Sequence, residues 1–349
     1  MGENAKKERP VRLPNIFEAV LPILVMMVLM IYGFIGGGDY TDAHMPLVIS
    51  IAVACIIGGI CGHSFSDMLA GMLDRLNATM EAILILCTVG ILVATFIMSG
   101  TIPALIYYGL DLLTPSLFLP VGCLMVSIVS LACGSSWTAT ATIGIAFLGI
   151  GAGLGINPAL TAGMVISGAY VGDKFSPLSD TTNLAAAVAQ TGLFDHVTAM
   201  ISTTAPTFII SLILYTILGL NIDTSNFDAS VATDLQHALA EGFNLNPLVL
   251  LPIAVIIVVC ILKMPGLVGI AISVGVGILC TIVFQGMHSV SDLFNTLHYG
   301  ITLESSNDLA NELLSRGGMD SQMWTINLIL LAVAYGGALE RCGCIETLF

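Results

Sequence analysis

The sequence predicts an all-α polytopic membrane protein, and both its composition and the distribution of its apolar residues indicate this class. Hydrophobic residues make up 56% of the 349 residues and charged residues only 9%, with a mean hydropathy of +0.98. A soluble domain carries about 25% charged residues, so a water-exposed surface cannot be built from this composition. Several uncharged windows are also long enough to cross a hydrocarbon core about 30 Å thick.

Charge and cysteine usage exclude several other classes of protein. The formal net charge is −14, the acids lie mainly between apolar windows, and nine Lys and Arg residues are too few for a nucleic-acid surface. The nine cysteines are scattered and mostly lie inside apolar runs, which is not the pattern of a disulfide framework. We find no nucleophile–base set and no metal-ligand cluster, so we expect neither an enzyme nor a bound cofactor.

The positions of the basic residues predict how the chain is oriented in the membrane. Four of the nine Lys and Arg residues lie within residues 6–12, before the first apolar window. By the positive-inside rule, the N-terminal tail, residues 1–15, lies in the cytoplasm. Counting spans onward places Arg75, Lys263 and Arg341 on the same inner side. We therefore expect a multi-pass protein of the cell's inner membrane with a cytoplasmic N-terminus.

Three short segments recur in the same order along the chain, which predicts an internal repeat. The matches join Leu-Pro-Ile at residues 21–23 and 251–253, His-Ser-x-Ser-Asp at 63–67 and 288–292, and, more loosely, residues 99–102 and 342–345. The repeat divides the chain into a first transmembrane copy, an outer loop and the start of a second copy. Their predicted boundaries are residues 16–220, 221–246 and 247–349, with an inserted loop near residues 302–322.

The elements of the first copy predict an inverted repeat. In order, we expect spans near residues 17–36, 46–62 and 82–99, two short arms at 117–133 and 136–153, an interrupted segment at 158–190, and a last span at 197–220. A polar, glycine-bearing tip joins the two arms, which is typical of a re-entrant hairpin. If the hairpin does not cross, five crossings remain, and an odd number makes the second copy enter from the opposite side.

The second copy stops after its third span, so residues of the first copy between about 106 and 220 have no counterpart. We therefore expect the second repeat to be incomplete and the chain to be truncated at its C-terminal side relative to a complete transporter.

Residues 172–183, Gly-Asp-Lys-Phe-Ser-Pro-Leu-Ser-Asp-Thr-Thr-Asn, form a polar segment between two apolar half-helices. Pro177 removes an amide donor and clashes with the carbonyl four residues earlier, so the helix should unwind here and free carbonyl groups at membrane depth. Buried carboxylates and an ammonium cost several kcal/mol unless they are paired, hydrated or bound to an ion. The plainer alternative is a polar loop at the membrane face, with Asp173 and Lys174 forming a surface ion pair.

The residue types in this segment suit a hard monovalent cation. The segment has neither thiolate nor imidazole, which argues against zinc or copper. Asp173 and Asp180 are the predicted Na+ ligands, and each could exchange a proton for the cation, because burial raises the pKa of a carboxyl group whereas Lys174 lowers it. The remaining predicted ion-binding residues are Ser176, Ser179, Thr181, Thr182 and Asn183.

A second polar cluster lies at the tip of the predicted hairpin. Its hydroxyl groups, on Ser135, Ser136 and Thr138, fall within reach of the interrupted segment, and we expect them to contribute to the same site. The alternative is that hydroxyl groups inside a transmembrane helix bond only the carbonyl groups of their own helix.

The run Gly-Ala-Tyr-Val-Gly-Asp-Lys-Phe-Ser-Pro-Leu-Ser-Asp-Thr-Thr-Asn-Leu-Ala at residues 168–185 resembles the signature of the NhaC-type sodium/proton antiporter family. The Gly-Ser-Ser-Trp motif at 134–137 and Ala-Gly at 162–163 also resemble that family. The resemblance implies a bacterial or archaeal inner-membrane protein, a broken-helix inverted-repeat fold of the ion-transporter superfamily, and Na+/H+ exchange. The family also contains malate/lactate and amino-acid exchangers, so the resemblance leaves the solute open.

Two functional hypotheses follow. The first is exchange of Na+ for H+ by alternating access, with small ions as the only partners. The second is Na+- or H+-coupled exchange of small organic acids, such as malate or lactate, or of amino acids, in which hydroxyl groups, helix N-termini and Lys174 hold a carboxylate. A channel or a scaffold is a third and weaker alternative, and a homodimer is left open.

Overall fold

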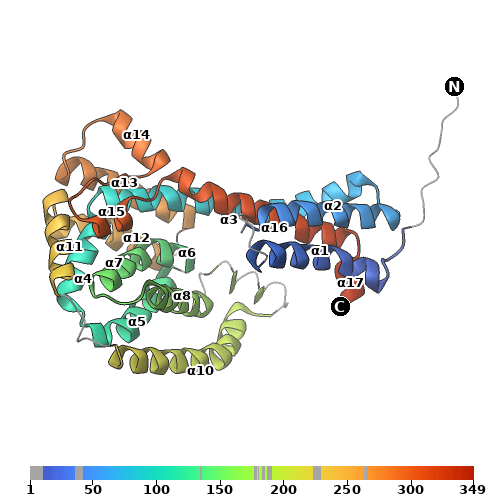
Figure 1. Cartoon of the computed structure of the whole chain (residues 1–349), viewed down its shortest axis with the longest axis horizontal. Helices are drawn as coiled ribbons and strands as arrows, with labels where there is room; N and C mark the ends of the chain where they lie inside the picture. Colours follow the sequence, from blue (N-terminus) through green and yellow to red (C-terminus); the bar gives the residue numbers. More distant parts are fainter. Residues whose placement is uncertain are drawn as a thin grey trace. The chain divides into compact units, whose positions relative to one another are not determined.

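The computed structural model describes residues 11–35, 42–133, 136–176, 179, 181–182, 185–186, 191–222, 229–262, 264 and 266–349 (Figure 1). For residues 34–35, 81–82, 132–133, 138, 229, 260–261 and 266 it describes the backbone alone. All regular structure in these residues is helical, and no strand occurs among them. The prediction of an all-α chain is therefore confirmed.

Several helices match the requirements of a membrane span in length and composition. Within the described residues, four are long and apolar enough, and the count rises to six if each of two bent helix pairs is taken as one span. Shorter apolar helices add to these, at His44–Ile60, Pro115–Leu131 and Thr140–Gly153. This pattern is that of a multi-pass membrane protein. The four single helices are Ile16–Gly33, Leu193–Leu220, Leu267–Phe284 and Met319–Arg341.

The chain forms two compact units, and each of them contains residues of both predicted copies of the repeat. The first unit contains residues 1–86 and 322–349, and the second contains residues 87–321. Helix α3 runs from the first unit into the second. The helices of the first unit are α1 (Ile16–Ile35), α2 (His44–Ile60), the first part of α3 (Phe65–Met98), α16 (Met323–Arg341) and α17 (Cys344–Leu348).

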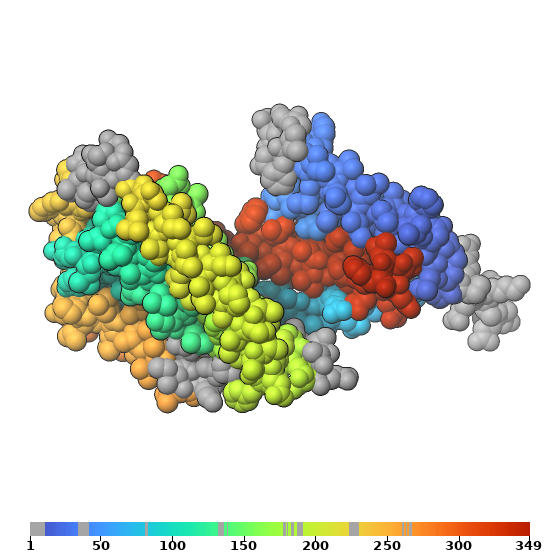
Figure 2. All heavy atoms as spheres, turned by 90° about the horizontal axis from the view of Figure 1, so that it is seen from below, coloured from blue at the N-terminus to red at the C-terminus, as the bar shows by residue number. Residues whose placement is uncertain are grey.

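In the first unit, α2 packs against both α1 and α16, and α17 packs against α1. Figure 2 shows the red α16 and α17 lying against the blue α1 and α2. The shared core includes Ala54, Met68 and Ala338, each at most 1% exposed.

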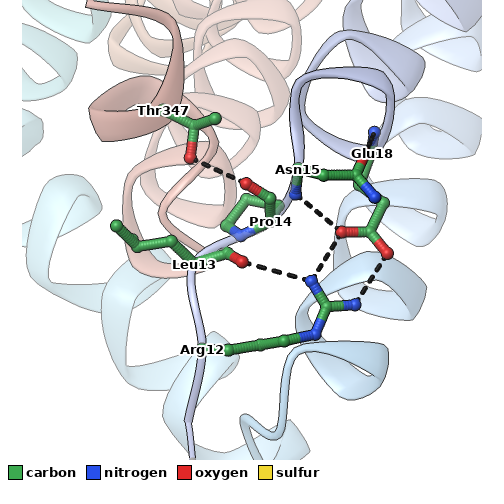
Figure 3. A network of polar contacts seen from close by, with 6 residues as sticks. All are labelled: Arg12, Leu13, Pro14, Asn15, Glu18 and Thr347. Carbon is green, nitrogen blue, oxygen red and sulfur yellow. Dashed lines mark hydrogen bonds and ion pairs between the residues drawn. The ribbon is translucent and has the colours of Figure 1, made fainter.

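A polar network holds the start of α1 (Figure 3). The Arg12 guanidinium donates two hydrogen bonds to the Glu18 carboxylate, both 2.7 Å long, and the Asn15 amide donates a third at 2.8 Å. The Thr347 hydroxyl, on α17, donates to the Pro14 carbonyl at 3.1 Å. These contacts tie the two ends of the first unit together.

Helices α3 and α16 approach each other at two glycines. A Cβ atom on Gly337 would lie 2.6 Å from the Gly71 carbonyl oxygen, and one on Gly71 would lie 2.6 Å from the Cβ of Arg341. About one turn further on, Arg75 and Glu340 form a bidentate ion pair with N–O distances of 2.5 and 2.6 Å. The absence of side chains at the crossing allows this close backbone contact, which is how helices commonly associate in membranes.

The second unit contains the remaining helices. In chain order they are α4 (Thr101–Leu112), α5 (Pro115–Cys133), α6 (Ser136–Ala139), the π-helical turn η1 (Thr140–Gly144), α7 (Ile145–Gly153), α8 (Pro158–Phe175), α10 (Leu193–Leu220), α11 (Ala229–Gly242), η3 (Pro247–Leu250), α12 (Leu251–Ile261), α13 (Gly266–Phe284), α14 (Val290–Tyr299), α15 (Asp308–Leu314) and η4 (Met319–Gln322).

The core of the second unit forms around α5 and α8. These two helices pack along each other, and α10 covers both of them. Figure 2 shows α10, in yellow-green, lying along the surface beside the teal α5. Phe118, Cys123, Met164 and Ala169 are fully buried between these helices and α7.

Two of the three motifs that recur in the sequence adopt the same local structure at both positions, whereas Leu-Pro-Ile lies inside α1 at residues 21–23 and at the start of α12 at residues 251–253. Ser64 and Ser289 each precede a helix, and their hydroxyl groups accept a hydrogen bond from the amide three residues later, at 3.1 and 3.3 Å. Gly100 and Gly343 both have a left-handed backbone, with φ of 82° and 79°, and each begins a new helix. The serines are N-caps, and the glycines permit a sharp change of direction between helices.

Three segments differ from the sequence-based expectation. The span expected at residues 82–99 is the second part of a longer helix, α3, which already begins at Phe65, because the Ser64 cap starts it there. The segment expected as an outer loop, 221–246, contains α11, whose apolar residues Leu235 and Leu239 are fully buried. The inserted loop near 302–322 contains α15, which Asn307 caps.

Gly337→Ala should destabilise the first unit, because the new methyl group would meet backbone atoms of Gly71 and Met72 that cannot move aside. Overpacking of this kind costs about 1–3 kcal/mol. We expect a lower thermal unfolding midpoint in detergent, followed by circular dichroism.

Gly336→Ala is the matched control, since a Cβ atom at Gly336 meets nothing within 4 Å. It makes the same chemical change in the same turn of α16 and should leave the midpoint unchanged or slightly raised. Equal midpoints for the two variants would show that the α3–α16 crossing is not close-packed.

Candidate ion-binding site

The helix that carries the site, α8, has sequence signals at both ends. At its start the Asn157 side chain accepts a hydrogen bond from the Ala159 amide at 2.9 Å, and Pro158 occupies the first helical position. At its end Ser176 has an extended backbone, with φ −83° and ψ 122°. A residue that precedes proline avoids the helical region, so Pro177 accounts for this end. The helix break predicted near Gly172–Pro177 therefore falls after Phe175.

Helix α8 approaches α5 closely at two glycines. A Cβ atom on Gly168 would lie 2.4 Å from the Cys123 carbonyl oxygen, and one on Gly172 would lie 2.2 Å from the Ser127 carbonyl oxygen. Between these points the Ser130 hydroxyl donates a hydrogen bond to the Ala169 carbonyl at 2.5 Å. The two backbones are thus in direct contact just before Asp173, and this contact determines where Asp173 lies.

Asp173 is a buried carboxylate in the last turn of α8, with only 4% of its surface exposed. Its Oδ2 atom accepts a hydrogen bond from the Thr181 hydroxyl at 3.1 Å and lies 3.8 Å from the Lys174 ammonium. The Lys174 ammonium in turn donates to the Thr181 hydroxyl at 2.9 Å. The Thr181 oxygen therefore bridges the carboxylate and the ammonium.

The chain after α8 folds back onto Asp173 through hydroxyl groups. Ser179 and Thr181 share a hydrogen bond of 3.0 Å between their hydroxyl oxygens, and the Thr182 hydroxyl donates to the Asp173 carbonyl at 3.3 Å. The Ser176 amide also donates to the Asp173 carbonyl, at 3.1 Å. Ser176, Ser179 and Thr182 are at most 1% exposed. We call Asp173, Lys174, Ser179, Thr181 and Thr182 the Asp173 network.

The electrostatics of this position favour a positive charge. The last turn of a helix carries the negative end of the helix dipole, so a carboxylate placed there gains from a nearby cation. Lys174 supplies that cation, and its side chain is 33% exposed whereas that of Asp173 is 6% exposed. The buried carboxylate therefore has a counter-ion that reaches toward the surface.

The structure brings together part of the predicted site. Asp173, Lys174, Ser179, Thr181 and Thr182 form one network, and Ser176 joins it through its backbone. Their role as ion ligands stays a prediction. Asp180, Asn183 and Ser135 lie outside the described residues, and the Thr138 side chain lies outside the described side chains.

The predicted hairpin tip lies beside the same helix. Ser136 begins the short helix α6, which packs against both α5 and α8, but the described part of the chain has no hydrogen bond between Ser136 and the Asp173 network. Further along, the Thr142 hydroxyl donates a hydrogen bond of 3.4 Å to the carbonyl of Ala139, three residues earlier.

Two features near the site were not predicted from the sequence. Ser127 and Ser130 are buried residues of α5, 8% and 0% exposed, and the Ser127 backbone and the Ser130 Cβ atom lie against the glycines of α8. The spacing of four residues between Gly168 and Gly172 was a signal for this contact, since small residues four apart mark close helix pairs. The π-helical turn η1, just after α6, has no comparable signal, although such turns are frequent at functional sites.

The residues available for a metal are hard oxygen donors. No group of three or more His, Cys, Asp or Glu side chains comes together in the part of the chain that the structure describes. One carboxylate surrounded by hydroxyl and carbonyl oxygens suits a weakly held alkali cation better than a transition metal.

Gly172→Ala should displace α8 from α5, because its methyl group would meet the Ser127 carbonyl and the Leu131 amide. We expect a loss of about 1–3 kcal/mol in stability, measured as a lower thermal midpoint in detergent. Gly163→Ala is the control on the same helix, since its methyl group would meet only the Tyr215 hydroxyl at an ordinary 3.7 Å. If both variants melt together, the α5–α8 contact does not position Asp173.

Comparison with known proteins identifies the family. The model of the Na+/H+ antiporter family matches residues 168–349, which include the Asp173 network. The chain is 37% identical to the Na+/H+ antiporter NhaC of Alkalihalophilus pseudofirmus over 88% of its length, and covers 66% of that relative. It is 34% identical to the malate-2H+/Na+-lactate antiporter of Bacillus subtilis and 36% identical to the arginine/ornithine antiporter ArcD of Halobacterium salinarum.

The last two matches each extend over 97% of this chain and over 72% and 70% of the relatives. The chain thus spans about two thirds to three quarters of the length of these proteins. No solved structure matches it. The long family match and the identities above 30% agree with the resemblance found at residues 168–185, and the chain belongs to the Na+/H+ antiporter family.

Proposed function

We propose that this chain exchanges Na+ for H+ across a membrane by alternating access, and that Asp173 is the group that binds the two ions in turn. The observation that carries the proposal is a buried carboxylate at the unwound end of a helix, surrounded by hydroxyl groups in a multi-pass membrane protein. An acid in such a place is a functional-site candidate by default, because its burial is costly.

Exchange follows from competition for one carboxylate. A proton and a Na+ ion both neutralise Asp173, so binding one releases the other. The Lys174 ammonium lies 3.8 Å from the Asp173 oxygen, so Lys174 would supply the positive charge between the binding of one ion and the next. Because the Lys174 side chain is one-third exposed, it can move into water when an ion arrives. Thr181 then keeps its hydroxyl directed at the carboxylate, and Ser179 holds Thr181 in place.

We further propose an inverted-repeat architecture with the N-terminus in the cytoplasm and the membrane as the bacterial or archaeal inner membrane. It is supported by the two serine caps at Ser64 and Ser289 and by the two left-handed glycines at Gly100 and Gly343, which recur in the same order. The arms α5 and α6–α7 would form the re-entrant hairpin beside the broken α8. The transporter would act as a monomer or a homodimer, without a cofactor.

A second candidate is coupled exchange of a small organic acid or an amino acid. It is favoured by Lys174, whose partly exposed ammonium can bind a carboxylate, and by relatives whose names specify malate, lactate, arginine and ornithine. In that case Asp173 binds the coupling ion and the solute binds beside it.

Asp173→Asn should lower Na+-driven H+ exchange by more than about tenfold. The variant removes the charge that holds the ion, and a charge-assisted contact contributes about 1.5–3 kcal/mol, where 1.4 kcal/mol is a factor of ten. The measurement uses this chain in proteoliposomes with a trapped pH-sensitive dye and an external Na+ pulse.

Asp308→Asn is the matched control, because Asp308 is an exposed acid at the start of α15. It should exchange as the parent does. If Asp173→Asn exchanges as fast as Asp308→Asn, Asp173 is not the ion-binding carboxylate.

Thr181→Val should weaken the apparent affinity for Na+ about two- to tenfold, because it removes the hydroxyl that bridges Lys174 and Asp173. A net hydrogen bond contributes about 0.5–1.5 kcal/mol. Thr181→Ser restores the hydroxyl and should recover most of the affinity in the same dye assay. Equal weakening in both variants would assign the effect to packing and not to the hydrogen bonds.

Flux measurements in the same vesicles distinguish the two candidate functions. Efflux of labelled malate, lactate, arginine or ornithine that requires a Na+ or pH gradient would favour the second. Dye signals driven by Na+ with no solute present would favour the first.

A further inference from the structure

A second group of polar side chains lies outside the Asp173 network, in the first unit. It consists of Asp42, just before α2, His44, the first residue of α2, and Trp324, in the first turn of α16. His44 is 9% exposed and its ring contacts the Trp324 ring edge-on, with centroids 5.2 Å apart. We call these three residues the His44 cluster.

Both ring nitrogens of His44 face oxygen atoms that can only accept hydrogen bonds. Nδ1 lies 2.5 Å from the Asp42 carboxylate, and Nε2 lies 3.2 Å from the Trp324 main-chain carbonyl. A neutral imidazole has one N–H and can satisfy only one of them, which leaves a lone pair directed at the other oxygen. An imidazolium donates to both. The geometry is therefore complete only when the ring carries its second proton.

We propose that His44 is a second proton-binding site of this antiporter, and that its proton joins the start of α2 to the start of α16. The Nδ1–Asp42 contact stays on the α2 side, whereas the Nε2 contact reaches the backbone of α16, 280 residues away in the chain. Loss of the proton removes a donor from one of these two contacts and loosens the junction between the two helices.

The surroundings of the ring agree with this assignment. Asp42 is held in place by a second donor, the Trp324 indole N–H, at 3.1 Å. The hydrogen bond from His44 is the main cause that lowers the pKa of Asp42, so its carboxylate is ionised where histidines titrate.

Other charged groups on the helices that pack here lie apart from the ring. Those of α16, Glu340 and Arg341, stand at its opposite end, Asp320 in η4 just before α16 is exposed, and Glu18 of α1 pairs with Arg12. Among the described residues, Asp42 is thus the titratable group that contacts His44.

The direction of the pH effect follows from proton linkage. The protonated ring makes two contacts in the folded protein that the neutral ring cannot make together. One of the two contacts therefore loses its donor when the ring gives up its second proton. The inference does not depend on ion exchange at Asp173.

Trp324 provides a direct probe. The chain has two tryptophans, so Trp137→Phe leaves Trp324 as the only one. A protonated imidazole in contact with an indole quenches its fluorescence. We expect the emission of the full chain in detergent to rise with pH in a single step as the ring loses its second proton. Adding His44→Gln should abolish the titration, and adding His288→Gln, an exposed histidine, should leave it intact.

Asp42→Asn gives an independent measurement that does not require His44 to be replaced. It removes the charge that holds the proton, and should lower the proton affinity in the same titration about tenfold or more. The proposal is overturned if the parent shows no titration, if His44→Gln leaves the titration unchanged, or if Asp42→Asn does not shift it. Should His44→Gln fail to fold, the Asp42→Asn result decides alone.

Discussion

The backbone contact between α5 and α8 at Gly168 and Gly172 is the constraint on which the candidate site depends. Helices in lipid gain little from burying apolar side chains against each other, since the lipid is equally apolar, so close packing and hydrogen bonds must hold them together. Two glycines bring the α8 backbone to within van der Waals contact of α5, and Ser130 adds a hydrogen bond to the Ala169 carbonyl. Asp173 follows directly after this contact, so a rigid helix pair presents its carboxylate.

The same means of association recurs in the first unit. Gly71 and Gly337 allow α3 and α16 to cross with their backbones in contact, and the Arg75–Glu340 ion pair lies one turn away. Charged residues are scarce in this chain, and several of those described are paired with an opposite charge or a hydroxyl donor near a helix end. For Asp173, the buried member of these pairs, the nearby Lys174 ammonium and Thr181 hydroxyl lower the cost of burial.

In both the Asp173 network and the His44 cluster a carboxylate lies beside a basic nitrogen, but the two differ in which of these groups is buried. At Asp173 the carboxylate is buried, and its partners Lys174 and Thr181 are the more exposed. At His44 the base is buried, and the carboxylate of Asp42 is partly exposed. Under the two proposals, one proton binds at Asp173 during exchange and another binds at His44 beside a helix junction, so the two sites would respond to pH separately.

The protein class, the ends of α8 and the family could be predicted from the sequence, because each depends on composition or on residues close together in the chain. The apolar windows indicate a multi-pass membrane protein, Asn157 and Pro158 start α8, Pro177 accounts for its end, and the run at residues 168–185 points to the family. The beginning of α3 at Phe65 was missed, although Ser64 and Asp67 are a local start signal, because the polar residues that follow interrupt the apolar pattern.

Only the tertiary structure decided which groups meet. Thr181 was predicted to share the site with Asp173, but its position between the carboxylate and Lys174 depends on how the chain turns after Ser176. The contact of His44 with Trp324 joins residues 280 positions apart, and no periodicity encodes it. Such contacts depend on the angle at which two helices cross and on how closely they approach. Small residues such as Gly172 and Gly337 allow the close approach. The crossing is therefore a property of two segments together, and neither segment's sequence encodes it alone.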